Sequence, residues 1–139
     1  KGLIDLEMRM GIINTLVDEI CAISSESVQH YREALMKRLK QANLDLDLND
    51  ERVLKEIALF ADRCDISEEI TRLKSHLSQF KQSIGDDELI GRKLEFIFQE
   101  INREVNTIAS KANQIEIINR VLSCKNEIER IREQLQNVE

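Results

Sequence analysis

The chain has 139 residues, of which 42% are hydrophobic and 33% charged, with four glycines and no proline. This length suffices for one domain with its own core, and the scarcity of glycine and proline predicts long helices joined by short connectors. The net charge of −6 argues against broad, nonspecific affinity for nucleic acid, so an anionic partner would have to be held locally.

Membrane insertion and disulfide stabilisation are both disfavoured by the sequence. No stretch reaches the roughly 18 uninterrupted apolar residues of a membrane span, and early charges interrupt any signal-peptide pattern. The cysteines, Cys21, Cys64 and Cys124, are odd in number and form no CxxC pair. A disulfide framework or a zinc site is therefore not expected, and a reducing cytoplasm fits.

The first segment, residues 3–23, predicts a helix with a coiled-coil-like seam. Its apolar residues alternate at spacings of three and four: Leu3, Leu6, Met10, Ile13, Val17 and Ile20. Such a seam packs against another helix, either in the same chain or in a second subunit.

A second helix should follow, with Ser24 or Ser25 as its N-cap, and should run to about Ala42. Leucines at positions 44, 46 and 48 then alternate with aspartates. This alternation is also typical of a short strand, but a lone strand has no partner in so helical a chain. We therefore predict an extended connector, followed by a third helix over roughly residues 50–63.

In the second half, Asp65 is the expected N-cap of a helix, and Glu68 completes a capping box. This helix should end near Gly85 and bury one stripe: Ile66, Ile70, Leu73, Leu77 and Phe80. The C-terminal segment repeats the seam spacing: Ile117, Val121, Cys124, Ile128, Ile131, Leu135 and Val138. The predicted fold class is all-α, with long helices in a bundle or hairpin arrangement and seams that serve hairpins or subunit contacts.

Residues 91–112, GRKLEFIFQEINREVNTIASKA, form the most informative stretch. One helical stripe is apolar: Leu94, Ile97, Phe98, Ile101, Val105, Ile108, Ala109 and Ala112. The other face mixes both charges, amides, hydroxyls and Phe96, whereas an ordinary solvated face is mostly Glu, Lys and Ala. We interpret this face as a functional site.

Two carboxylates on this helix, Glu100 and Glu104, are four residues apart and so share one face. Carboxylates at this spacing can hold a divalent cation or divide acid and base roles. The alternative is a solvated pair balanced by Arg103 and Lys93, which is the commoner arrangement on helices.

On the preceding helix, Glu69 and His76 lie two turns apart along one edge, with Arg72 between them. His76 could serve as a metal ligand or general acid, Glu69 as the carboxylate, and Arg72 as a phosphate clamp. A histidine beside a core stripe is, however, more often a hydrogen-bonded structural residue.

Phe96 could stack on a base, as aromatic residues do in single-strand binders, or pack into a subunit contact or under a neighbouring helix. The candidate phosphate contacts are Arg63, Arg72, Arg92, Lys93, Arg103 and Lys111, which could equally be salt-bridging surface residues. No Walker loop, GxGxxG, HExxH or Ser-His-Asp elbow is present.

Two long motifs resemble the YicC/YloC family of bacterial proteins: ADRCDISEEITRLKSHLSQF at residues 61–80 and residues 91–112. The ending IEIINRVLSCKNEIERIREQLQNVE at residues 115–139 is also similar to that family. Residues 1–60 resemble the looser helical region that precedes these motifs. Ala109 departs from the family pattern, where glycine is expected in many relatives, but the change is conservative in size.

The resemblance implies a metal-assisted endoribonuclease acting on RNA, in an oligomeric cytoplasmic protein for which a hexamer is one candidate. It implies that residues 1–48 are a helical hairpin or connecting region, that 49–139 form the C-terminal helical domain, and that the family's N-terminal half is absent. The matching polar positions are Arg63, Asp65, Glu68, Glu69, Arg72, Ser75, His76, Arg92, Lys93, Gln99, Glu100, Asn102, Arg103, Glu104, Asn106, Ser110, Lys111, Arg132, Glu133, Gln136 and Asn137.

The leading hypothesis is that Glu100 and Glu104, with Glu69 and His76, hold Mg²⁺ or Mn²⁺ and act in catalysis. The expected RNA-binding residues are Arg63, Arg72, Arg92, Lys93, Arg103, Lys111, Asn102 and Asn106. This arrangement requires the two helices to pack with their polar edges converging. The alternatives are a noncatalytic RNA-binding or adaptor module and an oligomerisation domain built on the two seams.

Overall fold

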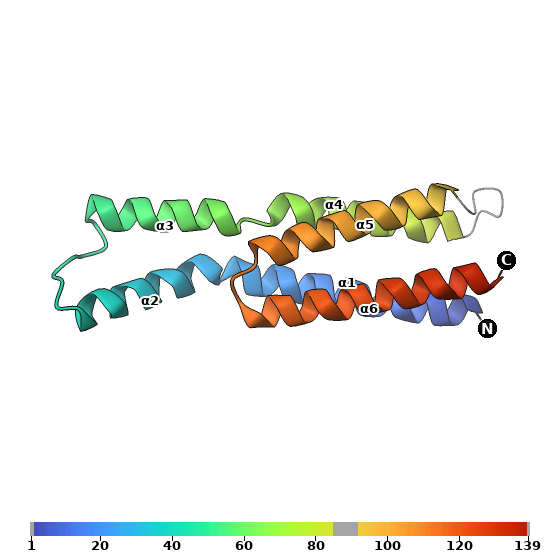
Figure 1. The fold of residues 1–139 in the computed structure, drawn as a ribbon, viewed down its shortest axis with the longest axis horizontal. Coiled ribbons are helices and arrows are strands. Elements are labelled where there is room, and N and C mark those ends of the chain that lie inside the picture. Colours follow the sequence, from blue (N-terminus) through green and yellow to red (C-terminus); the bar gives the residue numbers. More distant parts are fainter. Residues whose placement is uncertain (1, 85–91, 139) are drawn as a thin grey trace.

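The computed structural model describes residues 2–84 and 92–138, and side chains over 4–84 and 93–136. The described ranges form six helices: α1 (Gly2–Ser25), α2 (Ser27–Gln41), α3 (Glu51–Cys64), α4 (Ser67–Ile84), α5 (Arg92–Lys111) and α6 (Ile115–Val138). Helices α1, α4, α5 and α6 form a bundle, from one end of which α2 and α3 project as a hairpin (Figure 1). The all-α prediction is confirmed.

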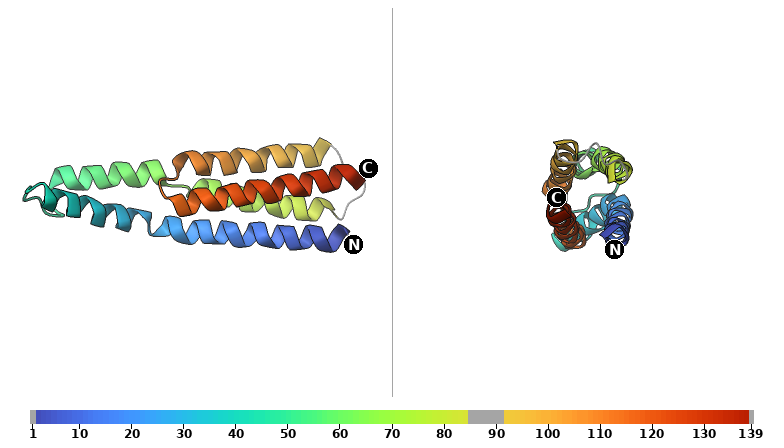
Figure 2. Two further views of the ribbon diagram at one scale, coloured as in Figure 1. Left: turned by 60° about the horizontal axis from the view of Figure 1, so that its bottom comes forward. Right: turned by 90° about the vertical axis from the view of Figure 1, so that its right-hand side faces the viewer.

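The core lies between the four bundle helices, which surround it in the end-on view of Figure 2. Both chain ends lie at the same end of the bundle, so α1 and α6 run antiparallel (Figure 1). The buried positions of their seams are Leu6, Met10, Ile13, Val17 and Ile20 in α1, and Ile117, Val121, Cys124, Ile128 and Ile131 in α6. The two seams belong to the same core, and α1 packs along α6. Leu3 and Val138 lie outside the described side chains.

Helices α4 and α5 close the other side of the core. The predicted stripe of α5 is buried from Leu94 to Ile108, and Ala109 and Ala112 are partly buried against it. Phe80 of α4 meets Phe98 of α5 with ring centroids 5.1 Å apart. This packing fixes the register of α4 against α5 and thereby the positions of their polar edges.

The α2–α3 connector has no regular structure over residues 44–47, as predicted. Asn43 at the end of α2 has a φ of 58°, the left-handed region that asparagine tolerates better than most residues. The Asn43 N–H donates to the Lys40 carbonyl at 3.0 Å and the Leu44 N–H to the Leu39 carbonyl at 2.9 Å. These two bonds form a Schellman motif, which satisfies the last carbonyls of α2.

The predicted serine cap of α2 is wrong. Ser25 ends α1, and its hydroxyl donates back to the Ala22 carbonyl at 2.7 Å. Helix α2 begins at Ser27, after Glu26, whose side chain makes no capping bond. The break between α1 and α2 is instead tied to the bundle by Ser27, which is buried and donates to the Gln114 side chain at 3.0 Å.

The predicted capping box before α4 forms only in part. An Asp65 carboxylate oxygen accepts from the Ser67 N–H at 2.9 Å and from the Ser67 hydroxyl at 2.6 Å. Glu68 does not complete the box, because its carboxylate accepts from Arg72 at 3.4 Å. The bonds from Ser67, aided by the charge of Lys111, hold the pKa of Asp65 below its ordinary value.

Replacing this cap should weaken the fold in a pH-dependent way. We expect Asp65→Ala to lower the free energy of unfolding at neutral pH by about 1 kcal/mol, because an N-terminal acceptor of α4 is lost. Since the pKa of Asp65 is lowered in the folded state, its contribution is present above the ordinary aspartate pKa. It disappears as the pH falls through the folded value.

Urea denaturation at neutral and acid pH measures both effects. Asp45→Ala, in the exposed connector, is the matched control. An equal loss in the two variants, or an Asp65→Ala deficit that persists at acid pH, would contradict this assignment.

Candidate active site

The polar edges of α4 and α5 meet along the length of the two helices. Arg72 of α4 donates through Nε to a Glu104 oxygen of α5 at 3.0 Å. Lys111 near the end of α5 donates through Nζ to a Glu69 oxygen of α4 at 3.1 Å and to the Asp65 carbonyl at 3.1 Å. These interactions connect Arg72 and Glu69 of α4 with Glu104 and Lys111 of α5. The sequence analysis had assigned these residues to the polar edges of two separate helices.

Two of these carboxylates are buried, with Glu69 only 5% and Glu104 only 4% exposed. Buried carboxylates persist only when they are paired or coordinate a metal ion. Arg72 serves three carboxylates, since its other nitrogens lie 3.4 Å from Glu68 and 3.5 Å from Glu69. The hydrogen bond to Glu104 raises the pKa of Arg72 above its ordinary value, so this guanidinium is permanently charged.

A second cluster lies one turn further along α4, where His76 faces Glu100 and Glu104. Each of the three offers one ligand atom, and these atoms all lie within 4.8 Å of one another. His76 Nε2 is 3.9 Å from a Glu100 oxygen. His76 Nδ1 is buried and has no hydrogen-bond partner, as is true of Glu69 Oε1.

The charges of this region do not cancel. Four carboxylates, Glu68, Glu69, Glu100 and Glu104, face only the two cations of Arg72 and Lys111, which leaves two negative charges over in these described contacts. Within the described ranges, His76 is the only basic side chain within 4.0 Å of the Glu100 carboxylate. The excess negative charge therefore favours a bound cation at this place.

The donor set suits a divalent cation. Two carboxylates four residues apart on one helix and an imidazole from its neighbour provide oxygen and nitrogen ligands from a rigid scaffold. An imidazole suits transition metals such as Mn²⁺ better than Mg²⁺, which prefers oxygen ligands and water. The alternative is purely structural, because the ion pairs of Arg72 and Lys111 already lock α4 to α5.

The remaining predicted residues are distributed around α5. Lys93 and Arg103 are exposed, and the helical spacing places them on or beside the edge that carries Glu100 and Glu104. Asn102 and Asn106 each follow one of these carboxylates by two residues, which turns them to the far side of the helix. Glu95 lies on that side and accepts from Arg132 of α6 at 2.7 Å. The structure therefore does not bring these two asparagines to the cluster.

Other predicted contacts lie apart from the cluster. Arg63 is paired within α3, with its guanidinium 3.7 Å from the Glu56 carboxylate. The side chain of Arg92 lies outside the described residues. Phe96 is 63% exposed, so the prediction that it packs under a neighbouring helix is wrong for the described chain. Base stacking and a subunit contact remain open for it.

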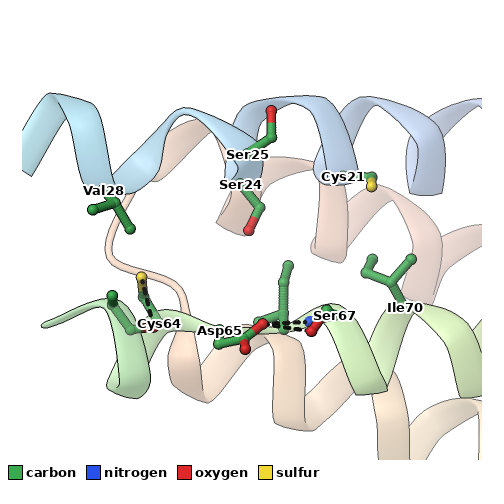
Figure 3. Close-up of a pocket in the computed structure, with 10 residues that line it drawn as sticks. Cys21, Ser24, Ser25, Val28, Cys64, Asp65, Ser67 and Ile70 are labelled. Atoms are coloured by element: carbon green, nitrogen blue, oxygen red, sulfur yellow. Dashed lines mark hydrogen bonds between the residues drawn. The ribbon is translucent and has the colours of Figure 1, made fainter. Parts of the chain in front are cut away.

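A cavity of about 370 Å³ lies where α1 passes into α2 and α3 into α4. In Figure 3, Cys21 and Ser24 of α1 face Cys64, Ser67 and Ile70 across it. Burial raises the pKa of the Cys64 thiol, which donates weakly to the Ala61 carbonyl. Burial therefore disfavours the reactive thiolate form of Cys64. Nothing in the sequence pattern indicates the cavity, because its lining comes from two segments some forty residues apart.

Comparisons with known proteins give a consistent result. Residues 20–139 match the family described as "Endoribonuclease YicC-like, C-terminal". "Probable endoribonuclease YicC" of Clostridioides difficile is 46% identical over 136 residues, which cover 97% of this chain and 46% of that protein. The protein of the same name in Haemophilus influenzae is 37% identical over 134 residues, covering 96% of this chain and 46% of that protein. The chain thus spans about half the length of the curated relatives it matches.

Proposed function

Because this chain belongs to the YicC-like endoribonuclease family, we propose that its protein cuts RNA internally and that the phosphodiester bond breaks at the His76–Glu100–Glu104 cluster. The observation that carries the proposal is the convergence of three possible ligand atoms within 4.8 Å beside an uncompensated negative charge. No described helix is both long enough and apolar enough to cross a bilayer.

In this proposal a divalent ion, Mn²⁺ or Mg²⁺, would be held by His76, Glu100 and Glu104. When bound, such an ion stabilises charge on the scissile phosphate and lowers the pKa of the water that attacks it. Glu69 lies outside this group of three ligand atoms, since Lys111 pairs with its Oε2 and its Oε1 has no hydrogen-bond partner.

The residues around the cluster divide into positioning and binding roles. Arg72 holds the Glu104 carboxylate in place, and Lys111 holds Glu69 while also tying α5 to the start of α4. Arg72 already pairs with three carboxylates, which makes it a weaker phosphate contact than an unpaired cation. The phosphate contacts are therefore assigned first to Lys93 and Arg103, whose charges are exposed along the same side of α5.

The test is cleavage of an end-labelled structured RNA by the full-length protein, with Mn²⁺, with Mg²⁺ and with a chelator. The proposal expects internal cuts that require the divalent ion. If this chain alone also cuts, the site is complete within it.

A noncatalytic RNA-binding module is the second candidate, and one observation favours it. The network of Arg72, Lys111, Glu69 and Glu104 joins α4 to α5 without any ion. On this reading the protein binds RNA with an affinity that falls with salt but never cuts it. RNA binding without cleavage under every metal condition would reject the nuclease proposal.

We also propose that the protein is a homo-oligomer in the cytoplasm. Exposed apolar side chains support self-association. Phe96 on α5 and Ile4, Met8 and Ile12 along one face of α1 are all exposed. Phe96→Ala should therefore shift the assembly state in sedimentation velocity, whereas Glu129→Gln, on exposed α6 surface, should not. An unchanged profile for Phe96→Ala would leave base stacking as the remaining role for this ring.

A further inference from the structure

The α2–α3 hairpin projects beyond the bundle (Figure 1). Tyr31, on one side of α2, provides the ring contact and a hydrogen bond that hold α2 to α3. Tyr31 of α2 stacks on Phe60 of α3 with ring centroids 3.8 Å apart. The Tyr31 hydroxyl donates to the Glu56 carboxylate of α3 at 2.7 Å. The helical period turns residues 29, 32, 36 and 40 away from this contact, so a second face of α2 is left for another purpose.

Helix α2 is basic in a chain that is acidic overall. Its fifteen residues carry Arg32, Lys37, Arg38 and Lys40 against a single carboxylate, Glu33, while the whole chain has a net charge of −6. In the part of the chain that the structure describes, none of these four cations has a carboxylate within 4.0 Å. Arg32 donates only to the Gln29 side chain, at 3.5 Å. Arg38 and Lys40 lie in the last turn of α2, where they interact favourably with the helix dipole, but no ion pair in the described ranges uses any of the four charges.

A groove of about 390 Å³ lies on this face of α2. Arg32, Lys37 and Lys40 line it together with Gln29 and Glu33, which are hydrogen-bonded to each other at 3.0 Å. Its apolar surface comes from Met36 of α2 and from Leu48 of the connector, which is 44% exposed. The groove thus combines three cations with an apolar surface made by Met36 and Leu48.

We propose that this α2 groove binds a single-stranded stretch of the RNA that is cut at the α4–α5 cluster. The inference rests on the proposed function, because RNA is the anion that the protein would act on. Lysine and arginine recognise phosphates through charge, and an apolar surface between them accepts an unstacked base. Local positive charge of this kind can hold a strand that the acidic remainder of the chain repels.

Two other occupants fit the groove less well. A membrane-surface helix needs a wide apolar face, whereas the larger apolar side chains of α2 face α3 and leave only Met36 and Leu48 in the groove. A duplex presents its phosphates on a rigid outer surface and its bases inside the stack, so it cannot place a base against Met36. The groove and the cluster lie at different positions along the long axis (Figure 1), so a strand must be long enough to reach both.

The test compares two matched double variants in the full-length protein. Lys37→Gln/Lys40→Gln removes two lysines of the groove. Lys81→Gln/Lys125→Gln removes two exposed helical lysines elsewhere that likewise form no ion pair in the described ranges. The probe is a fluorescein-labelled oligouridylate, and binding is followed by anisotropy over a series of salt concentrations. A shorter oligouridylate that cannot reach both surfaces is the second probe.

For the groove variant we expect the dissociation constant of the long probe to rise roughly tenfold at low salt, and the slope of log K against log salt to fall by about 1.4. The control variant should match the wild type. Cleavage at saturating RNA should be unchanged in the control variant, because Lys81 and Lys125 lie in neither the cluster nor the groove. Equal effects of the two pairs on RNA affinity, or no effect of either, would overturn the proposal. So would loss of binding to phosphatidylglycerol vesicles with RNA affinity intact, which would identify a membrane contact.

The outcomes also separate this inference from the proposed nuclease function. If the wild type cuts RNA and the groove variant binds the long probe normally, only the inference falls. If the groove variant loses affinity while the wild type never cuts, the RNA-binding groove stands and the nuclease function falls. A wild type that binds no oligouridylate at all overturns the inference directly.

Discussion

Replacing Glu104 by glutamine should reduce RNA cleavage by the full-length protein roughly a hundredfold or more, since a ligand of the proposed divalent ion is lost. The substitution keeps the size of the side chain and removes only its charge and one acceptor. Arg72 still has the carboxylates of Glu68 and Glu69 beside it, so the guanidinium is not left alone. RNA affinity should stay close to that of the wild type, because the exposed cations are untouched.

Single-turnover cleavage at saturating RNA is the relevant measurement. Glu129→Gln removes an exposed carboxylate of α6 and should cleave like the wild type. Circular dichroism and the urea midpoint show whether Glu104→Gln is folded. A folded Glu104→Gln protein that retains the wild-type metal-dependent rate would show that the carboxylate belongs only to the structural network between α4 and α5.

Phe80→Ala should give the largest loss of stability, about 3–5 kcal/mol in the free energy of unfolding. Phe80 is 1% exposed and packs against Phe98 of α5, so its removal leaves a cavity between the two helices that carry the cluster. Urea denaturation measures the change, and the slope of unfolding free energy against urea should stay near the wild-type value.

Phe96→Ala is the matched control, because it deletes the same side chain from the exposed side of the neighbouring helix. In monomeric protein it should change the free energy of unfolding by no more than about 0.5 kcal/mol. Similar losses in the two variants would contradict the assignment of Phe80 to the core and Phe96 to the surface.

The bundle was predictable because its apolar spacing is regular. The seams of α1 and α6 and the stripe of α5 were identified from three- and four-residue spacings alone, and their central positions are buried. The N-cap of α3 was not predicted: the Asp50 carboxylate accepts from the Arg52 N–H at 2.9 Å. What sequence could not decide was whether the two seams meet in one chain or between subunits, because both arrangements bury the same residues.

Local polar choices were harder to predict, because competing partners come from elsewhere in the fold. Ser25 was expected to cap α2 but bonds back to α1, while Ser27 bonds to the distant Gln114. Glu68 has the spacing of a capping box, yet Arg72 lies within reach on the same helix and takes its carboxylate. A nearby cation outcompetes a backbone N–H for a carboxylate because both partners are charged.

For the candidate site, the helical period predicted that Glu100 and Glu104 share one face. It did not predict how that face lies relative to α4. His76 joins them only because Phe80 and Phe98 set the register of the two helices. The burial of Glu104 was not foreseen, since the pattern assigned it to a polar face. The groove on α2 was not predicted, because part of its lining, Leu48, belongs to the connector. Helical spacing does not predict where the side chains of a connector lie.

The most direct test of the central claim is a titration of the full-length protein with Mn²⁺, in which electron paramagnetic resonance reports the free ion. The account predicts that Glu100→Gln/Glu104→Gln loses a bound Mn²⁺ per chain that the wild type holds. Glu116→Gln/Glu129→Gln, which removes two exposed carboxylates of α6, should keep it. Identical binding curves for the wild type and Glu100→Gln/Glu104→Gln would contradict the account, and the α4–α5 carboxylates would then be structural ion pairs alone.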